Sequence, residues 1–280
     1  MSTAIPLITK LSSRVLRVLG CNPGPMTLQG TNSYIIGTGK RRILLDTSES
    51  NKPDYILALE SVLQEHEVKI EKVLLSHWHY DHVGSAASVA ANPGIASEEC
   101  SFHKFPRTDV EASENYGVTC VKLSDGERIQ TEGATIKVIH TPGHTVDHAA
   151  FWLEEERALF TGDCVLGEGT TVLETLSDYM RSLHLLLALD AADAKSHISG
   201  YIAHREQREK QILECLKQQG DASFVTDEFI VRKVYKGLPE QLIPAATLNV
   251  SHHLTKLLEE GQVEQNVENA WRIASKNGKL

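Results

Sequence analysis

The stretch that decides the fold runs from Ser76 to His82 and reads Ser-His-Trp-His-Tyr-Asp-His. It holds three histidines and one aspartate within six residues, and it follows the apolar run Val73–Leu75, which predicts a buried strand. A single histidine on a surface loop is usually only a polar side chain, but four ligand-type side chains at this spacing indicate a metal. Imidazoles and carboxylates suit Zn²⁺, and also iron or manganese where oxygen ligands dominate.

The spacing within this loop divides its ligand-type side chains into two pairs. His77 and His79 can project to one side of the loop, whereas Asp81 and His82 turn to another side. The alternation therefore predicts that the loop serves two ions rather than one.

Two later segments carry the same kind of residue in the same setting. His140-Thr-Pro-Gly-His144 and Thr161-Gly-Asp163 each follow a short apolar run and place a ligand-type side chain in a turn that contains glycine. Asp46 closes the apolar run Ile43–Leu45 in a similar way. Enzymes of the α/β class place their chemistry on loops at strand ends, so these three segments are candidates for one site.

The first 200 residues alternate between strand-like and helix-like patterns, which favours an α/β fold. Residues 53–66 have apolar positions at helical spacing. Short apolar or β-branched runs predict strands at residues 15–19, 33–36, 42–45, 73–75, 118–123, 135–139, 149–153 and 158–160. The sequence therefore predicts a first domain over residues 1–200.

The texture changes near residue 200, where a second domain over residues 201–280 is expected. Tyr201–Gln219 predicts a charged helix that ends at Gly220, and two further helices are predicted over Asp227–Tyr235 and Ala245–Glu260, before a β wing at Gln262–Gln265. Three helices and a hairpin signal predict a winged-helix-like module. Such modules can bind DNA or serve as packing appendages. Because acidic and basic residues alternate here, we favour the appendage, through which the chain could form a homo-oligomer.

The amino-acid composition favours a globular protein and argues against two other classes, general nucleic-acid-binding proteins and membrane-spanning proteins. The 280 residues are 41% hydrophobic and 23% charged, as in globular proteins, and 28 Lys+Arg against 37 Asp+Glu give a formal charge of −9. A protein that grips nucleic acid over its whole surface should be basic, which leaves only a local basic groove. Lys40–Arg42 could supply one, the alternative being that they are solvated charges at the tip of a hairpin. No apolar run approaches the roughly 18–20 residues of a membrane span, so a soluble protein without a membrane partner is expected.

Cysteines and the N-terminal segment bear on the compartment. The five cysteines are widely spaced and form no CxxC pair, which predicts free thiols in a reducing compartment. The first acidic residue is Asp46, whereas Lys10, Arg14 and Arg17 come earlier among Ser, Thr and Leu. This pattern is similar to a mitochondrial transit sequence, but Ser13–Leu19 also reads as the first strand of the fold.

Taken together, the motifs resemble those of the metallo-β-lactamase superfamily over roughly residues 10–200. The resemblance implies a four-layered αββα sandwich with a dinuclear metal site at the sheet edge. The segments Val18–Tyr34 and Gly162–Thr171, together with the C-terminal module, more closely resemble the β-lactamase-like protein 2 family. That family implies an endoribonuclease that cleaves single-stranded RNA through a metal-activated hydroxide, in the mitochondrial matrix, with the cytoplasm as the alternative.

The resemblance also implies roles for individual residues. The implied zinc ligands are His77, His79 and His144 for the first ion, Asp81 and His82 for the second, and Asp163 as the bridge between them. Asp81 would also act in catalysis by orienting the nucleophile. Asp46 matches a buried structural aspartate rather than a ligand. Asp147 and His148 remain open between orienting the ligands and being ordinary polar residues of a turn.

One part of the family pattern is missing. The superfamily supplies a further ligand, a histidine in a Gly-His-Gly loop after a short strand, whereas here Leu185–Gly200 runs straight into the next helix. About a dozen residues are expected to be missing near Asp190–Asp193, as a splice variant or incomplete isoform, a defective gene model or a natural loss of function would each produce. His184, His197 and His204 are the nearest alternatives, but they lie in stretches that read as helical. We therefore expect one or two zinc ions per chain and reduced turnover.

Three functions remain open at this stage. The first is the single-stranded RNA endoribonuclease. The second is a thioester hydrolase of the glyoxalase II type, because the same metal motif supports attack on a carbonyl. The third is a non-catalytic member of the family that acts by binding, which the missing ligand loop favours.

Overall fold

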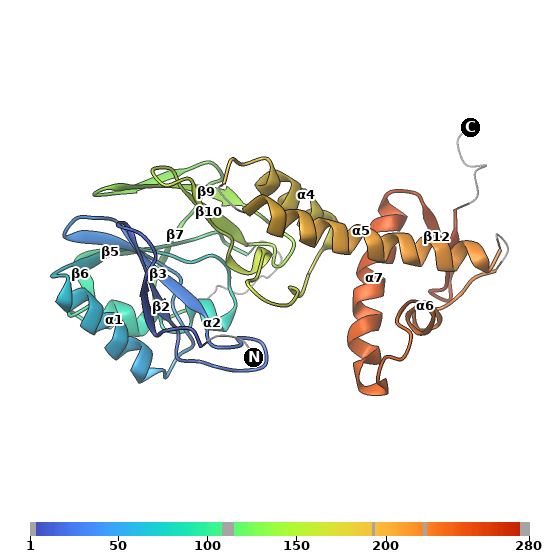
Figure 1. The fold of residues 1–280 in the computed structure, drawn as a ribbon, viewed down its shortest axis with the longest axis horizontal. Coiled ribbons are helices and arrows are strands. Elements are labelled where there is room, and N and C mark those ends of the chain that lie inside the picture. Colours follow the sequence, from blue (N-terminus) through green and yellow to red (C-terminus); the bar gives the residue numbers. More distant parts are fainter. Residues whose placement is uncertain (1–3, 108–114, 192–193, 221–222, 275–280) are drawn as a thin grey trace. The chain divides into compact units, whose positions relative to one another are not determined.

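The computed structural model describes residues 4–107, 115–191, 194–220 and 223–274 (Figure 1). The chain forms two compact units, one of residues 1–171 and 190–192 and the other of residues 172–189 and 193–280. The domain boundary expected after residue 200 falls inside one continuous helix, α5 (Ala194–Gln218). This helix begins before the charged segment from which the sequence predicted it.

The first unit contains a seven-stranded sheet whose strands lie in sequence order. The strands are β1 (Ile8–Lys10), β2 (Val15–Leu19), β3 (Asn32–Ile36), β4 (Arg41–Leu45), β5 (Lys69–Leu74), β6 (Ala96–Lys104) and β7 (Cys120–Lys122). Neighbouring strands pair antiparallel from β1 to β4 and parallel from β4 to β7. The carboxyl ends of β4, β5 and β6 therefore meet at one edge of the sheet.

Helices provide the crossovers between the parallel strands. They are α1 (Pro53–Glu65) between β4 and β5, and α2 (Tyr80–Val83) and α3 (Ala86–Ala91) between β5 and β6. In α1 a proline occupies the first turn, where its missing N–H costs nothing, and the buried face includes Tyr55, Leu59 and Val62. This face packs with residues of β2 to β5 in one continuous apolar core.

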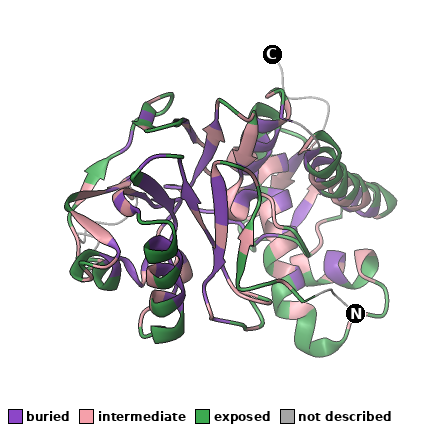
Figure 2. Cartoon of the chain, turned by 60° about the vertical axis from the view of Figure 1, so that its left-hand side comes forward, coloured by how far each residue is buried: buried purple, intermediate pink, exposed green. Residues whose placement is uncertain are grey.

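A second, four-stranded antiparallel sheet has the order β11-β10-β9-β8. Its strands are β8 (Arg128–Thr131), β9 (Ala134–His140), β10 (Ala149–Leu153) and β11 (Ala158–Phe160), and the short 3₁₀ turn η1 (Gly162–Cys164) follows β11. Apolar residues of both sheets, including Ile43, Leu74, Val138 and Phe151, form a shared core. Strands β2, β3, β4, β9 and β10 are mainly buried, whereas the helices carry exposed faces (Figure 2).

The second unit is helical with a small hairpin. After α4 (Leu176–Leu187) and α5 come α6 (Asp227–Val234), the 3₁₀ turn η2 (Glu240–Leu242), α7 (Ile243–Glu259), β12 (Val263–Gln265) and β13 (Trp271–Ile273). Thr226 caps α6, because its side chain accepts a hydrogen bond from the backbone N–H of Phe229 at 3.3 Å. The second half of α5, α6, α7 and the hairpin share one core.

The predicted fold class is confirmed: an α/β sandwich is followed by a winged-helix-like helical module. Several strands were not expected, most of all β6, whose sequence ASEECSFHK carries the exposed Glu98 and Glu99 in its middle and lacks a continuous apolar run. In the described part of the chain, no helix combines the length and the apolar character that crossing a membrane requires. All five cysteines are free thiols.

Candidate metal centre

Four loops meet at the edge of the two sheets. From the first sheet come Asp46, directly after β4, and residues 75–79, directly after β5. From the second sheet come residues 141–148, between β9 and β10, and Asp163, just after β11. The fold thus brings segments that are far apart in the sequence to one place.

Three imidazole nitrogens converge in this place. His77 Nε2 lies 3.0 Å from His79 Nδ1, and His144 Nε2 lies 3.2 Å and 3.0 Å from these two atoms. With a carboxylate oxygen of Asp163, the four donor atoms lie within 4.8 Å of one another. Around a tetrahedral zinc ion with Zn–N bonds of about 2.0–2.1 Å, ligand nitrogens are about 3.3 Å apart. The geometry of the three histidines therefore fits a tetrahedral ion.

The remaining ring nitrogens of two of these histidines are fixed by hydroxyl groups. His77 Nδ1 lies 2.9 Å from Ser76 Oγ, and His144 Nδ1 lies 3.0 Å from Thr171 Oγ1. Such outer contacts hold a ligand ring in orientation and select the tautomer that presents the other nitrogen to a metal.

Burial keeps two histidines of this group, His77 and His79, neutral. Burial, followed by the nearby imidazoles of His82 and His144, lowers the pKa of His77 well below its ordinary value. Burial lowers the pKa of His79 to about 4. Because a metal binds the neutral imidazole, both side chains are in the binding form at pH 7.

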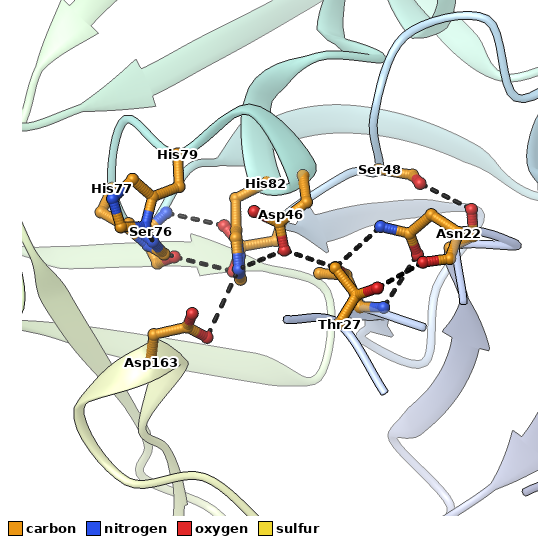
Figure 3. A network of polar contacts seen from close by, with 12 residues as sticks. Asn22, Thr27, Asp46, Ser48, Ser76, His77, His79, His82 and Asp163 are labelled. Carbon is orange, nitrogen blue, oxygen red and sulfur yellow. Dashed lines mark hydrogen bonds and ion pairs between the residues drawn. The ribbon is translucent and has the colours of Figure 1, made fainter. Parts of the chain in front are cut away.

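A second group of donors surrounds the Nε2 atom of His82 (Figure 3). This atom lies 3.3 Å from Asp81 Oδ2 and 3.4 Å from Asp163 Oδ1, while Asp163 Oδ2 lies 3.7 Å from His144 Nε2. Asp163 thus stands between the two groups, in the position of a bridge. Burial would lower the pKa of His82, but the carboxylates of Asp163 and Asp46 raise it well above its ordinary value. Carboxylates that favour a positive charge on His82 also suit a divalent cation beside its ring.

The turn that delivers Asp163 requires a glycine. Gly162 has a φ of +48°, in the left-handed region, and a Cβ on this residue would lie 2.6 Å from His148 Nε2. Any other residue would therefore clash with the buried His148 and displace Asp163.

Asp46 organises the loop rather than joining the donor groups (Figure 3). It is 3% exposed and accepts hydrogen bonds from Ser76 N at 2.7 Å and Ser76 Oγ at 2.8 Å, and its Oδ2 lies 2.9 Å from His82 Nδ1. The structure thus places it as the buried structural residue that the resemblance implied.

Two polar residues that the sequence left without a role hold Asp81. Thr31 Oγ1 donates a hydrogen bond of 2.6 Å to Asp81 Oδ2. Asn22 in turn donates from Nδ2 to Thr31 Oγ1 at 3.1 Å, and its Oδ1 accepts from the backbone N–H of Thr31 at 2.9 Å. Both residues belong to the segment Val18–Tyr34, which resembles the family, but the sequence did not predict that they contact Asp81.

The alternative histidines lie elsewhere. His184, His197 and His204 are exposed side chains on α4 and α5 of the second unit, and none belongs to the donor group found among the described residues. The expected deletion near Asp190–Asp193 falls partly on residues 192–193, which lie outside the described residues. Residues 188–191 form no strand.

The basic segment Lys40–Arg42 does not supply a groove at this site. It lies at the start of β4, the end opposite Asp46, and Lys40 pairs with Glu67 at 2.8 Å while Arg41 pairs with Glu99 at 3.5 Å. The expectation of substrate-binding cations there is therefore wrong, because these side chains belong to the far end of the strand.

A buried ion pair supports the loop that carries His144. Lys104 ends β6 and Asp147 lies in this loop; Lys104 Nζ is 2.5 Å from Asp147 Oδ2, and the two side chains are 1% and 0% exposed. The neighbouring His148 has its Nδ1 2.8 Å from Thr141 Oγ1 across the same loop. Both residues thus hold the loop in shape rather than contacting a metal position.

Breaking this ion pair should destabilise the protein strongly. Lys104→Met leaves Asp147 as an uncompensated buried charge, which typically costs about 3–5 kcal/mol, whereas Lys104→Met with Asp147→Leu should recover most of the loss. Urea unfolding of the single and double variants measures this. The control Arg128→Met removes the exposed pair with Glu154 and should cost no more than about 1 kcal/mol. Equal losses for Lys104→Met and Arg128→Met would contradict the assigned role.

Comparison with known proteins agrees with this architecture. The metallo-beta-lactamase superfamily matches residues 26–197, and the beta-lactamase associated winged helix domain matches residues 226–271. The chain is 44% identical over 273 residues to a "Beta-lactamase-like protein 2 homolog" of Drosophila melanogaster, covering 92% of each chain. It is 41% identical to the Caenorhabditis elegans protein of that name, covering 94% of this chain and 90% of the relative.

A solved structure shows the same fold. A metallo-beta-lactamase family protein from Thermus thermophilus superposes with a TM-score of 0.70 at 23% identity, covering 94% of this chain and 100% of the other. The family match spans more than half of the chain, and the two curated relatives cover nearly all of it. The chain therefore belongs to the metallo-beta-lactamase superfamily of metal-dependent hydrolases.

Proposed function

We propose that this protein is a zinc-dependent endoribonuclease that cleaves single-stranded RNA, with activity lowered by the loss of one ligand loop. The observation that carries the proposal is the sharing of Asp163 between two donor groups, one around His77, His79 and His144 and the other around His82. RNA as the substrate class rests on the resemblance to the β-lactamase-like protein 2 family, the name that two curated relatives of this chain carry.

The donor set favours zinc. Three imidazoles and one carboxylate within reach of one point are ligands that zinc prefers, whereas magnesium and calcium favour all-oxygen sites. A divalent ion held there would make a water acidic enough to attack at neutral pH and would neutralise charge on a phosphodiester.

The protein's own side chains would prepare the attack. Asp81, held by Thr31, has a carboxylate that can accept a hydrogen bond from the attacking water and orient it. Asp163 lies within reach of both donor groups, and the neutral His77 and His79 would hold a first ion without competition from protons at pH 7.

We further propose that the second ion binds weakly. Its donor group consists of Asp81, His82 and Asp163, one ligand fewer than the group around His77. Arg157, the residue before β11, donates from Nε to Asp190 O at 3.1 Å, so residue 190 lies beside the start of β11. Because β11 is an edge strand of the second sheet, a further strand could pair with it there.

A location in the mitochondrial matrix is also proposed, on the resemblance to the family. The basic N-terminal residues do not add to it, because Val15–Leu19 forms β2 of the sandwich. Association through residues 201–280 into a homo-oligomer remains a proposal as well.

One experiment tests the proposed function. The protein is purified without chelators, and metal content per chain and cleavage of a labelled single-stranded RNA are measured on the same sample. We expect about one zinc ion per chain and slow cleavage that a chelator abolishes and zinc restores. Hydrolysis of S-lactoylglutathione without RNA cleavage would indicate the thioester hydrolase instead, and neither activity would indicate a non-catalytic member.

A further inference from the structure

We propose that the winged-helix-like module binds the phosphate backbone of single-stranded RNA through a basic patch of Arg208, Lys233 and Lys236. The inference rests on the proposed function, because it assigns a second place where the RNA substrate is held. All three residues belong to the second unit, whereas the metal ligands belong to the first.

Arg208 makes the most informative contact of the patch. It lies in the middle of α5, and its Cζ atom is 3.8 Å from the centroid of the ring of Tyr235, which ends α6. This distance is within the range of a cation–π contact, and both residues are half-buried. Tyr235 packs against the core that α5, α6 and α7 share. The ring therefore holds the guanidinium from a well-supported position.

Two lysines extend the positive charge along the same two helices. Lys233 is exposed, and its charge reaches Cys215 of α5, where it opposes the rise that burial causes in the pKa of the thiol. Cys215 comes seven residues after Arg208, which places the two residues on the same side of α5. Lys236 is exposed and follows Tyr235 directly. The three cations thus lie where α6 packs against α5.

The carboxylates closest to the patch in the sequence are engaged by other cations. Glu209 Oε2 lies 2.9 Å from Lys256 Nζ, and Glu228 Oε1 and Glu240 Oε1 each lie 2.9 Å from a guanidinium nitrogen of Arg232. Within the ranges that the structure describes, none of the three cations of the patch forms an ion pair with a carboxylate. Their charge is therefore available to a ligand.

The other glutamates of α5 near Arg208 lie on different sides of the helix. Glu206 is two residues before Arg208, and Glu214 is six residues after it. At 3.6 residues per turn, these positions are about 160° and 120° away from Arg208 around the helix axis. Neither carboxylate therefore faces the patch.

The arrangement suits a phosphodiester backbone. A guanidinium that stacks on a ring keeps N–H donors at its edge, and these match two oxygens of a phosphate. The aromatic contact restricts the side chain before binding, so less rotamer entropy is lost when a phosphate binds. Because the whole chain has a formal charge of −9, it needs a local basic surface of this kind to hold a polyanion.

A membrane surface suits the patch less well. Peripheral binding to a bilayer needs exposed apolar side chains next to the cations. The two residues between Lys233 and Lys236 are Val234 and Tyr235, and both are half-buried. The patch thus offers charge without an exposed apolar anchor between its lysines.

RNA binding by the full chain is the first measurement. The Kd of a labelled single-stranded RNA oligonucleotide is measured by fluorescence anisotropy in the Asp81→Asn background, which slows cleavage. Arg208→Gln should weaken binding about tenfold and lower the slope of log Kd against log salt by about 0.7, the value of one phosphate contact on a single strand. Adding Lys233→Gln should lower the slope by about as much again. Arg208→Lys should keep the slope but lose part of the affinity, because a lysine cannot form the bidentate contact.

The matched control is Arg232→Gln. Arg232 is an exposed arginine of α6 directly before Lys233, and Glu228 and Glu240 already neutralise its charge. This substitution changes the net charge of the chain as much as Arg208→Gln does, but it removes no cation of the patch. It should therefore change Kd by less than about twofold. Equal losses of affinity in Arg232→Gln and Arg208→Gln would contradict the assignment of the patch.

Further measurements separate the patch from the metal centre and from lipid binding. Arg208→Gln with Asp81 intact should leave the metal content and the hydrolysis of bis(p-nitrophenyl) phosphate unchanged, and a loss of either would overturn the inference. Sedimentation with phosphatidylcholine vesicles that contain phosphatidylserine tests the alternative ligand. Vesicle binding that Arg208→Gln abolishes, with an unchanged Kd for RNA, would assign the patch to a membrane surface instead.

Failure of the inference and failure of the proposed function give different results. If the chain cleaves RNA but the Arg208→Gln, Lys233→Gln double variant keeps the parent's Kd and salt slope, only the inference is wrong. If RNA binds through the patch but the chain with Asp81 intact does not cleave it, only the proposed function is wrong. A chain that binds no RNA at all would overturn both.

Discussion

Replacing Asp163 with alanine should remove both the bound metal and the hydrolytic activity. Asp163 faces His144 on one side and His82 on the other, so one substitution takes a donor from both groups. Losing a side chain that merely supports a metal ligand typically costs 10–100-fold in affinity or activity. A ligand shared by two positions should cost more, so we expect activity to fall by more than about 100-fold. Metal content by mass spectrometry and hydrolysis on the same sample measure this.

The control for Asp163→Ala is Glu168→Ala. Glu168 is an exposed carboxylate five residues further along the chain, and its removal should change neither metal content nor activity. Retention of full metal content and activity by Asp163→Ala would contradict the bridging position assigned to this residue.

Adding the ligand loop that we propose this chain lacks should produce the largest gain. Insertion of a strand and a Pro-Gly-His-Gly loop after Ala191 adds one imidazole to the group of Asp81, His82 and Asp163. We expect bound zinc to rise from about one toward two ions per chain. Hydrolysis should rise by about 10–100-fold or more, because even supporting residues of a metal site contribute that much.

The matched control is the same insertion with alanine in place of its histidine. It repairs the sheet edge equally but adds no ligand, so it should leave the zinc content near one ion. If the histidine and alanine insertions give equal zinc content, the account of the second metal position is wrong, and the fourth ligand must come from elsewhere.

Much of the candidate site was visible in the sequence because it is local. His77, His79, Asp81 and His82 lie within one loop, and their residue types identify metal chemistry without knowledge of the fold. The sandwich and the winged-helix-like module followed from apolar periodicity and from the resemblance. Periodicity failed for β6, whose exposed Glu98 and Glu99 interrupt the pattern, because pairing with β5 and β7 on its two sides determines that strand.

The rest of the site depends on contacts between distant residues. Thr31 holds Asp81 across 50 positions, and Lys104 meets Asp147 across the two sheets. Nothing in the local sequence of Lys104 or Arg107 distinguishes a buried lysine in an ion pair from an arginine whose Cζ lies over the Trp78 ring. The two side chains differ in their surroundings because of where each lies relative to the paired ends of β5 and β6, and that pairing depends on the whole sheet.

The origin of the ligands in two different sheets has a consequence for the unfolding of the protein. His77 and His144 are 67 positions apart, and each is attached to its own sheet. An ion bound between them is in effect a reversible cross-link across the sandwich, so folding and metal supply are thermodynamically linked. Free ion at 100 times its Kd would add about 2.7 kcal/mol to the free energy of unfolding. If the site holds the ion proposed for it, a chelator would thus lower the free energy of unfolding of this domain, as a mild denaturant does.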